Sequence, residues 1–156
     1  MKKLSIAIVL AAILALPTIA QAREVTFTTV LNNYSGDGAY LAIYLVDASG
    51  RYQRTLWVAG EKTKYYKHLA DWARGSRLQA SEYDGRTGAS VLSKGSLVVT
   101  ADIPDAMIDA GYEVRVDTAV EDLRDNRADV AVPLTTVGAD KPVVGRGYVQ
   151  SFSYRF

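Results

Sequence analysis

The sequence predicts an all-β protein, an immunoglobulin-like antiparallel β-sandwich that carries one short amphipathic helix. About seven short segments are rich in β-branched and aromatic residues or alternate apolar with polar side chains. Turn-forming residues separate these segments at the spacing expected of a sandwich. Only residues 62–74 show helical periodicity instead.

The N-terminus has the features of a bacterial secretory signal peptide. Two lysines follow the first methionine, an apolar run comes next, and a small-x-small cleavage site ends at Ala22. The apolar run is short for a membrane span of about 20 residues, which disfavours a retained anchor. We therefore expect residues 1–22 to be removed. Residues 23–156 are expected to form a single domain that is periplasmic and soluble.

Composition limits the classes of function. The sequence has no cysteine, so it offers no disulfide, no lipoprotein anchor and no thiolate metal site, and the core must hold the fold together. The formal net charge is +1 and is close to neutral once the two signal-peptide lysines are removed. Because a nucleic-acid partner requires a basic face, we expect no nucleic-acid binding.

Three strands are expected in the first half of the mature chain. Residues 25–31 are rich in β-branched side chains, and residues 40–46 are apolar on both faces and therefore central. Residues 52–58 complete a hairpin through the turn at residues 47–50.

A helix is expected to follow and to lie on the sheet. In residues 62–74, the side chains of Tyr65, Leu69 and Trp72 recur at i, i+4 and i+7, which places them on one helical face. Gly75 stands where helices commonly end.

The second half predicts four more strands, at residues 96–102, 112–120, 129–132 and 149–156. Residues 104–110 form a connection with room for one helical turn, and residues 122–127 form a charged turn. The last strand alternates strictly. One of its faces carries Tyr148, Gln150, Phe152, Tyr154 and Phe156.

Residues 84–90, Asp-Gly-Arg-Thr-Gly-Ala-Ser, form a loop of small residues that we call the motif loop. Ser90 offers a primary hydroxyl, and Gly88 and Ala89 would allow another protein's active site to approach the backbone closely. The only histidine, His68, is predicted on the polar side of the helix, so no Ser-His-Asp site is indicated. Modification of Ser90 by a separate enzyme fits better, and ordinary turn chemistry remains the alternative.

Charged residues flank this hydroxyl. Arg86 and Lys94 would lie beside an incoming phosphate and offset its charge. Asp84 could help the modifying enzyme hold a metal, or could cap the turn.

The motif loop resembles the flavinylation motif Asp-x-x-Ser/Thr-Gly-Ala-Thr/Ser of extracytoplasmic redox proteins. FAD:protein FMN transferase recognises that motif, uses magnesium, and joins FMN through its phosphate to the last hydroxyl. The resemblance implies that Ser90 carries the FMN and that Asp84, Thr87, Gly88 and Ala89 take part in its attachment.

The resemblance extends over most of the mature chain. A strand pair with an Asp-x-x-Gly turn and Arg54-Thr55-Leu56 precedes a Leu69-x-x-Trp72 element, and a Gly111-Tyr112 strand start follows the motif loop. These features are similar to a bacterial periplasmic family, domain of unknown function 2271. That family is linked to flavin-based electron transfer outside the cytoplasm, often with PepSY-type membrane proteins.

This resemblance implies a carrier rather than an enzyme, in which the flavin ring performs the redox chemistry. Tyr83, Trp57 or Trp72 could stack on the ring, although core packing is the favoured role of both tryptophans. The alternative function is a cofactor-free, immunoglobulin-like module that binds a partner protein through an edge strand or a loop.

Two acidic clusters are candidate cation sites, since hard cations prefer several oxygen ligands. Neither has EF-hand spacing, and solvated turns explain both. The clusters are Asp102, Asp105 and Asp109, and Glu121, Asp122 and Asp125.

Overall fold

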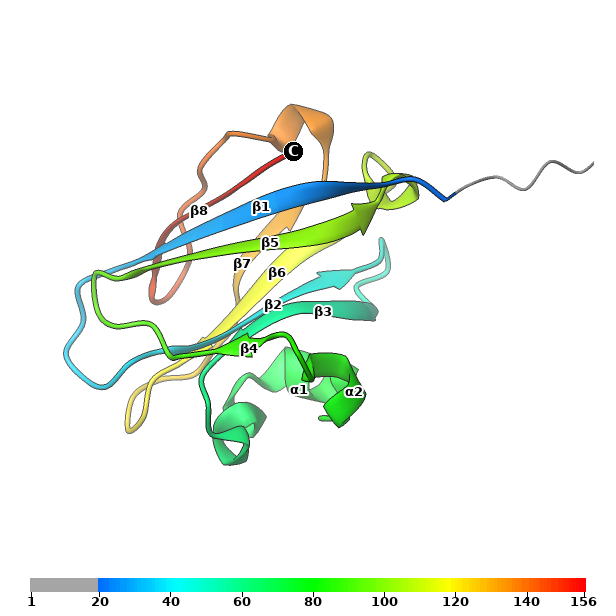
Figure 1. Ribbon diagram of the computed structural model, residues 1–156. Coiled ribbons are helices and arrows are strands. Elements are labelled where there is room, and N and C mark those ends of the chain that lie inside the picture. The colour runs from blue at the N-terminus through cyan, green and yellow to red at the C-terminus, as the bar shows by residue number, and fades with distance from the viewer. Residues whose placement is uncertain (1–19) are drawn as a thin grey trace, which may run out of the picture.

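The computed structural model describes residues 20–156, so the basic and apolar parts of the expected signal peptide lie outside the described residues (Figure 1). Two β-sheets pack face to face, which confirms the β-sandwich. The smaller sheet has the order β5 (Ser96–Pro104), β1 (Ala22–Leu31) and β8 (Val149–Arg155). The larger sheet has the order β4 (Thr87–Gly88), β3 (Tyr52–Ala59), β2 (Tyr40–Val46), β6 (Glu113–Ala119) and β7 (Asn126–Pro133).

All the strand pairs are antiparallel except one. The two-residue strand β4 pairs parallel to β3 at the edge of the larger sheet. β2 lies between β3 and β6 and is buried on both faces, as its continuous apolar sequence predicts. Short 3-10 helices also occur at η2 (Asp105–Met107) and η3 (Thr136–Gly138).

The inner face of the larger sheet, which faces the smaller sheet, packs into a mainly aliphatic core. Burying this apolar surface is the main stabilising contribution, at about 25 cal/mol per Å². Its largest fully buried members include Phe27, Leu41, Ile43, Leu45 and Phe152.

The strict alternation of buried and exposed side chains expected across residues 148–156 is wrong at the start of the strand. A bulge shifts the register of β1 against β8 at Leu31, and Gln150 becomes the extra residue. Gln150 is exposed, whereas Val149 is fully buried in the same core as Phe152. The strand therefore buries Val149 where strict alternation would bury Gln150.

The single helix expected over residues 62–74 is also wrong. The segment forms a 3-10 helix, η1 (Thr63–His68), and then an α-helix, α1 (Ala70–Ser76). The two are separated by Leu69, whose φ of −83° and ψ of 71° are not helical.

The 3-10 geometry changes which tyrosine is buried. The buried side chains are Tyr66, Leu69 and Trp72 rather than a set containing Tyr65. A 3-10 helix has three residues per turn, and Tyr66 lies three residues before the buried Leu69. Tyr65 is only half-buried and faces the opposite side of η1, toward the functional site described below.

The end of α1 differs from the expectation as well. Gly75 lies inside the helix, and close packing accounts for the glycine there, because a Cβ atom would collide with the side chain of Tyr52. The helix ends one residue later, and Arg77 takes the left-handed conformation, with φ of 54°. A further one-turn helix, α2 (Ala80–Tyr83), leads into the motif loop.

The helices η1, α1 and α2 cover the outer face of the larger sheet, which is the face turned away from the smaller sheet (Figure 1). This second core is aromatic and polar. The carboxylate of Asp117 on β6 is fully buried there and accepts hydrogen bonds from the backbone N–H groups of Asp71 and Trp72, each at 2.9 Å. These are donors of the first turn of α1, which lacks a cap of its own, so Asp117 fixes the start of that helix on the sheet.

Candidate functional site

The motif loop runs along the free edge of the larger sheet. It leaves α2, turns at Gly85, where φ is +74°, and forms β4 with Thr87 and Gly88. The carbonyl oxygens of Arg86 and Gly88 accept hydrogen bonds from the backbone N–H groups of Val58 in β3 and of Gly60 just after it, at 2.9 and 2.7 Å. The loop is therefore fixed to the sheet on one side and open on the other.

The end of the loop is fixed as well. Val91, the residue after Ser90, exchanges two backbone hydrogen bonds with Ala39, at 2.7 and 2.9 Å. Ala89 and Ser90 therefore span the gap between the edge strand and the start of β2. Ser90 also packs closely on Gly38, where a Cβ atom would collide with its hydroxyl.

The side chains that the resemblance assigns to cofactor attachment are accessible. Asp84, Thr87 and Ala89 are exposed, and Gly88 and Ser90 are half-buried. Within residues 20–156, the carboxylate of Asp84 and the hydroxyls of Thr87 and Ser90 form no hydrogen bond. Asp84 therefore does not cap the turn in this structure.

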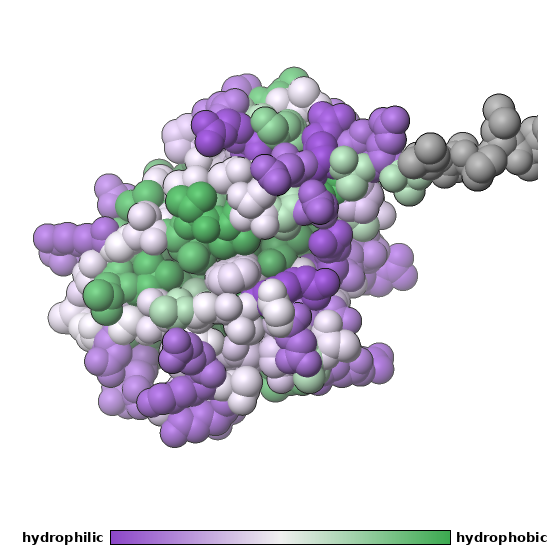
Figure 2. Space-filling model, in the orientation of Figure 1, coloured by the Kyte–Doolittle hydropathy of each residue, from purple (hydrophilic) through white to green (hydrophobic). Residues whose placement is uncertain are grey.

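Packing gives a reason for the glycine at position 88. A Cβ atom there would lie 2.8 Å from Cζ2 of Trp57, which is too close. Trp57 is half-buried beneath the loop, and its indole N–H has no hydrogen-bond partner in the described part of the chain. Figure 2 shows a band of hydrophobic surface between β5 and β4, along the open edge of the sandwich.

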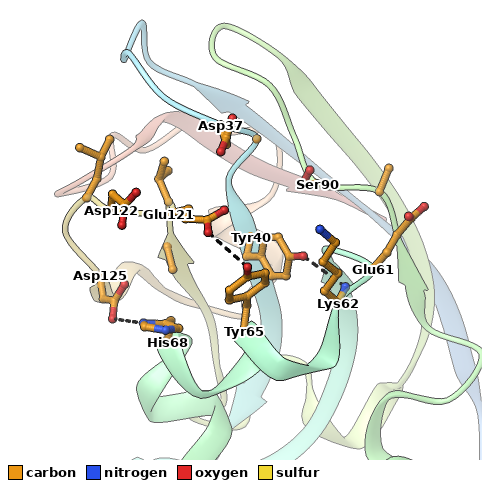
Figure 3. A pocket seen from close by; sticks show the side chains of 15 residues that line it. Asp37, Tyr40, Glu61, Lys62, Tyr65, His68, Ser90, Glu121, Asp122 and Asp125 are labelled. Carbon is orange, nitrogen blue, oxygen red and sulfur yellow. Dashed lines mark hydrogen bonds and ion pairs between the residues drawn. The ribbon is translucent and has the colours of Figure 1, made fainter.

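Ser90 and Ala89 lie on the wall of a cavity of about 720 Å³ (Figure 3). Three other segments complete it: the start of β2, the segment from Glu61 to His68, and the connection between β6 and β7. The cavity is therefore built by segments from four parts of the sequence.

Two tyrosines form an aromatic wall of this cavity. The rings of Tyr40 and Tyr65 meet edge to face, with centroids 5.7 Å apart. The hydroxyl of Tyr40 accepts a hydrogen bond from the backbone N–H of Lys62 at 3.2 Å, and the hydroxyl of Tyr65 donates to Glu121 at 3.2 Å. Both rings are thus held in place by neighbours within the cavity.

The cavity is acidic. One lysine, Lys62, and the single histidine, His68, are its basic side chains, and Nδ1 of His68 lies 2.9 Å from the carboxylate of Asp125. The carboxylates that line the cavity are Asp37, Glu61, Glu121, Asp122 and Asp125.

The histidine and the serine do not form a catalytic pair. Figure 3 shows Ser90 and His68 on opposite sides of the cavity, with Tyr40 and Tyr65 between them. Among residues 20–156 no hydrogen bond joins His68 to Ser90, so the imidazole is not placed to remove the serine proton.

Four carboxylates of the two acidic clusters have hydrogen-bond partners in the protein, namely Asp105, Asp109, Glu121 and Asp125. Nε of Arg23 donates to Asp105 at 2.8 Å, and this bond lowers the pKa of the Asp105 carboxyl. The backbone N–H of Thr136 donates to Asp109 at 2.8 Å. Across residues 20–156, no group of three or more histidine, aspartate or glutamate side chains is arranged to hold a metal ion.

The structure changes which residues surround the candidate acceptor. Lys62 lines the cavity with Ser90, whereas the expected phosphate partners Arg86 and Lys94 do not. Trp72 is fully buried, and Tyr83 packs against it with ring centroids 6.1 Å apart, so neither ring borders the cavity. Sequence reasoning missed Tyr40, Tyr65 and Lys62, because the helical reading of residues 62–74 placed Tyr65 in the core.

Residues 22–151 match the family DUF2271, which is described as predicted periplasmic protein. The chain belongs to this family. No protein among the curated sequences and no solved structure gives a significant match. No helix in residues 20–156 is long and apolar enough to cross a membrane. This match confirms the family predicted from the sequence, and the family's description supports a periplasmic location, whereas flavinylation stays a prediction.

Proposed function

We propose that this DUF2271 protein is a periplasmic electron-transfer carrier with FMN covalently attached to Ser90 by a separate FAD:protein FMN transferase. The observation that carries the proposal is the position of Ser90. It ends an exposed motif loop along the sheet edge, and it also lies on the wall of the cavity. The proposal includes a cleaved signal peptide at residues 1–22 and a soluble mature chain.

The residues present fit such a group. The Ser90 hydroxyl has no hydrogen-bond partner within the described residues that would have to be displaced, and the outer side of the motif loop is open to a modifying enzyme. The cavity volume of about 720 Å³ lies within the range of about 300–1,000 Å³ typical of small-molecule sites.

The attachment reaction balances with FAD as the donor. The oxygen of Ser90 bonds to the phosphorus on the FMN side of FAD, the pyrophosphate bond breaks, and AMP leaves. The serine proton passes to a base of the transferase, which also supplies the magnesium. The transferase would recognise the accessible residues that precede the acceptor, namely Asp84, Thr87, Gly88 and Ala89.

The bound flavin would supply the redox chemistry, and the protein would supply the tether and its surroundings. The protein would therefore act as a carrier rather than as an enzyme. By family resemblance, its redox partner would be a PepSY-type membrane protein.

Intact mass tests the proposal directly. Mature protein co-expressed with an FMN transferase should gain the mass of FMN less one water. Ser90→Ala should lose this gain, whereas Ser81→Ala, a nearby exposed serine in α2, should keep it. No gain in a system that modifies a control substrate would contradict the proposal and favour the cofactor-free binding module.

A further inference from the structure

We infer that the flavin ring carried by Ser90 rests inside the acidic cavity, against Tyr65 and Tyr40, rather than in solvent. This inference rests on the flavin attachment proposed above and adds the binding site of the ring. It assigns a ligand to the cavity and specific roles to side chains outside the motif loop.

The attachment point is the first argument. Ser90 is itself part of the cavity wall, so a group bonded to its hydroxyl begins at the lining of this space. Val91 fixes the backbone next to it through two hydrogen bonds with Ala39, and the close packing of Gly38 leaves little freedom on that side. A flexible ribityl chain then gives the ring access to the interior.

The aromatic wall is the second argument. Flat aromatic ligands gain contact area and favourable ring geometry from aromatic side chains. The ring of Tyr40 packs directly on Gly60, where a Cβ atom would collide with it. It also contacts the ring of Tyr66, with centroids 6.3 Å apart. Tyr65 is fixed by its hydrogen bond to Glu121. The wall is therefore preorganised rather than mobile.

Charge gives the third argument and a measurable consequence. The oxidised flavin ring is neutral, whereas two-electron reduction with uptake of one proton gives an anion. Five carboxylates line the cavity against one lysine and one histidine, so a ring inside it should resist becoming negative. Neutralising a carboxylate should therefore make the flavin easier to reduce.

Flavin fluorescence tests the position of the ring. In the flavinylated wild type, quenching by neutral acrylamide should be several-fold weaker than in the same protein unfolded in urea, where the ring is free. Tyr65→Ala should raise flavin emission several-fold, because tyrosine in contact with the ring quenches it. Tyr112→Ala is the matched control and should leave emission unchanged. Tyr112 is a half-buried tyrosine just before the first residue of β6, whereas the cavity lies at the last residue of that strand.

Potentiometry tests the role of the carboxylates. Glu121→Gln should raise the midpoint potential of the flavin by about 14 mV. For a two-electron couple this shift corresponds to a roughly threefold change in the ratio of oxidised to reduced flavin at a fixed potential. Glu113→Gln, at the far end of β6, should not.

The mass gain of each variant separates the two proposals. No gain in the wild type overturns both. A normal gain with equal acrylamide quenching in the folded and unfolded protein overturns the cavity site and leaves the carrier function standing. The folded-state comparison uses the wild type, so the result does not depend on whether Tyr65→Ala folds.

Discussion

The two faces of the larger sheet are stabilised in different ways. Along β2, Leu41, Ile43 and Leu45 point into the inner face, where neighbours are apolar and contacts are non-directional. On the outer face, the hydroxyl of Tyr44 donates to Asp117 at 3.0 Å, and the indole N–H of Trp72 donates to the hydroxyl of Thr55 at 2.9 Å.

The difference shows where the geometry of the site is determined. The inner face requires apolar side chains of suitable volume, whereas the outer face requires particular donors and acceptors. The outer face holds α1 and, through it, η1, which carries Tyr65 into the cavity. Changes on the outer face should therefore reach the site, and matched changes on the inner face should not.

Asp117→Ala should give the largest effect. The change removes a carboxylate that accepts four hydrogen bonds, including one from the backbone N–H of Ala128 at 2.8 Å, and leaves these buried donors unpaired. We expect a loss of about 3–5 kcal/mol in the free energy of unfolding, measured by urea denaturation. Asp102→Ala, an exposed aspartate on β5, should change stability by less than about 0.5 kcal/mol. If Asp117→Ala loses as little stability as Asp102→Ala is expected to lose, the Asp117 hydrogen bonds contribute nothing measurable.

Tyr44→Phe should cost about 1–3 kcal/mol, because it removes one donor to the buried Asp117 carboxylate. Burial raises the pKa of Asp117 in the folded protein above its ordinary value of 3.8, while its hydrogen bonds oppose that rise. Stability linked to a raised carboxyl pKa is fully present below the unfolded pKa and is lost as pH rises through the folded pKa.

Removing the Tyr44 donor should raise the folded pKa of Asp117 further. The cost of Tyr44→Phe should therefore be larger at pH 7 than at pH 4. Urea denaturation of both proteins at the two pH values measures this difference. A cost that is the same at both values would contradict a charged, hydroxyl-stabilised Asp117.

Gly88→Ala should destabilise the protein about as much as Tyr44→Phe, and it should also change the packing of the motif loop on Trp57. The new methyl group would lie 2.8 Å from the Trp57 ring, and such overpacking costs about 1–3 kcal/mol. A change in the near-ultraviolet circular dichroism of the indole should accompany the loss. Thr87→Ala, at the exposed neighbouring position, should leave both signals unchanged. If Gly88→Ala behaves like Thr87→Ala, the glycine serves recognition alone.

The sequence predicts the inner face well and the outer face poorly, for the same physical reason. Alternation and β-branched composition report burial between two sheets, so β1, β2 and β5 are found close to their expected bounds. The outer face depends on pairs distant in sequence, such as Asp117 with the start of α1, which no local pattern reveals.

The errors near the site have the same origin. A period of 3.6 placed Tyr65 in the core, whereas the 3-10 helix has a period of three and buries Tyr66. Without Tyr65, the cavity could not be inferred, although the motif loop itself was recognisable from its residues. The acidic cluster containing Glu121 is visible in the sequence, but its place in the same cavity as Ser90 follows only from the pairing of β2 with β6.

Ile43→Val, on the inner face of the larger sheet, should have the smallest effect. The residue is fully buried on the inner face and has no hydrogen-bonding side chain, so losing one methyl group should cost about 0.5–1.5 kcal/mol. In the flavinylated protein, the emission and midpoint potential of the flavin should stay at their wild-type values. Its neighbour Tyr44 faces the helices that carry Tyr65, so Tyr44→Phe should alter flavin emission. If Ile43→Val changes the flavin signals as much as Tyr44→Phe does, both faces of the larger sheet position the site, and non-directional and specific packing do not differ in this respect.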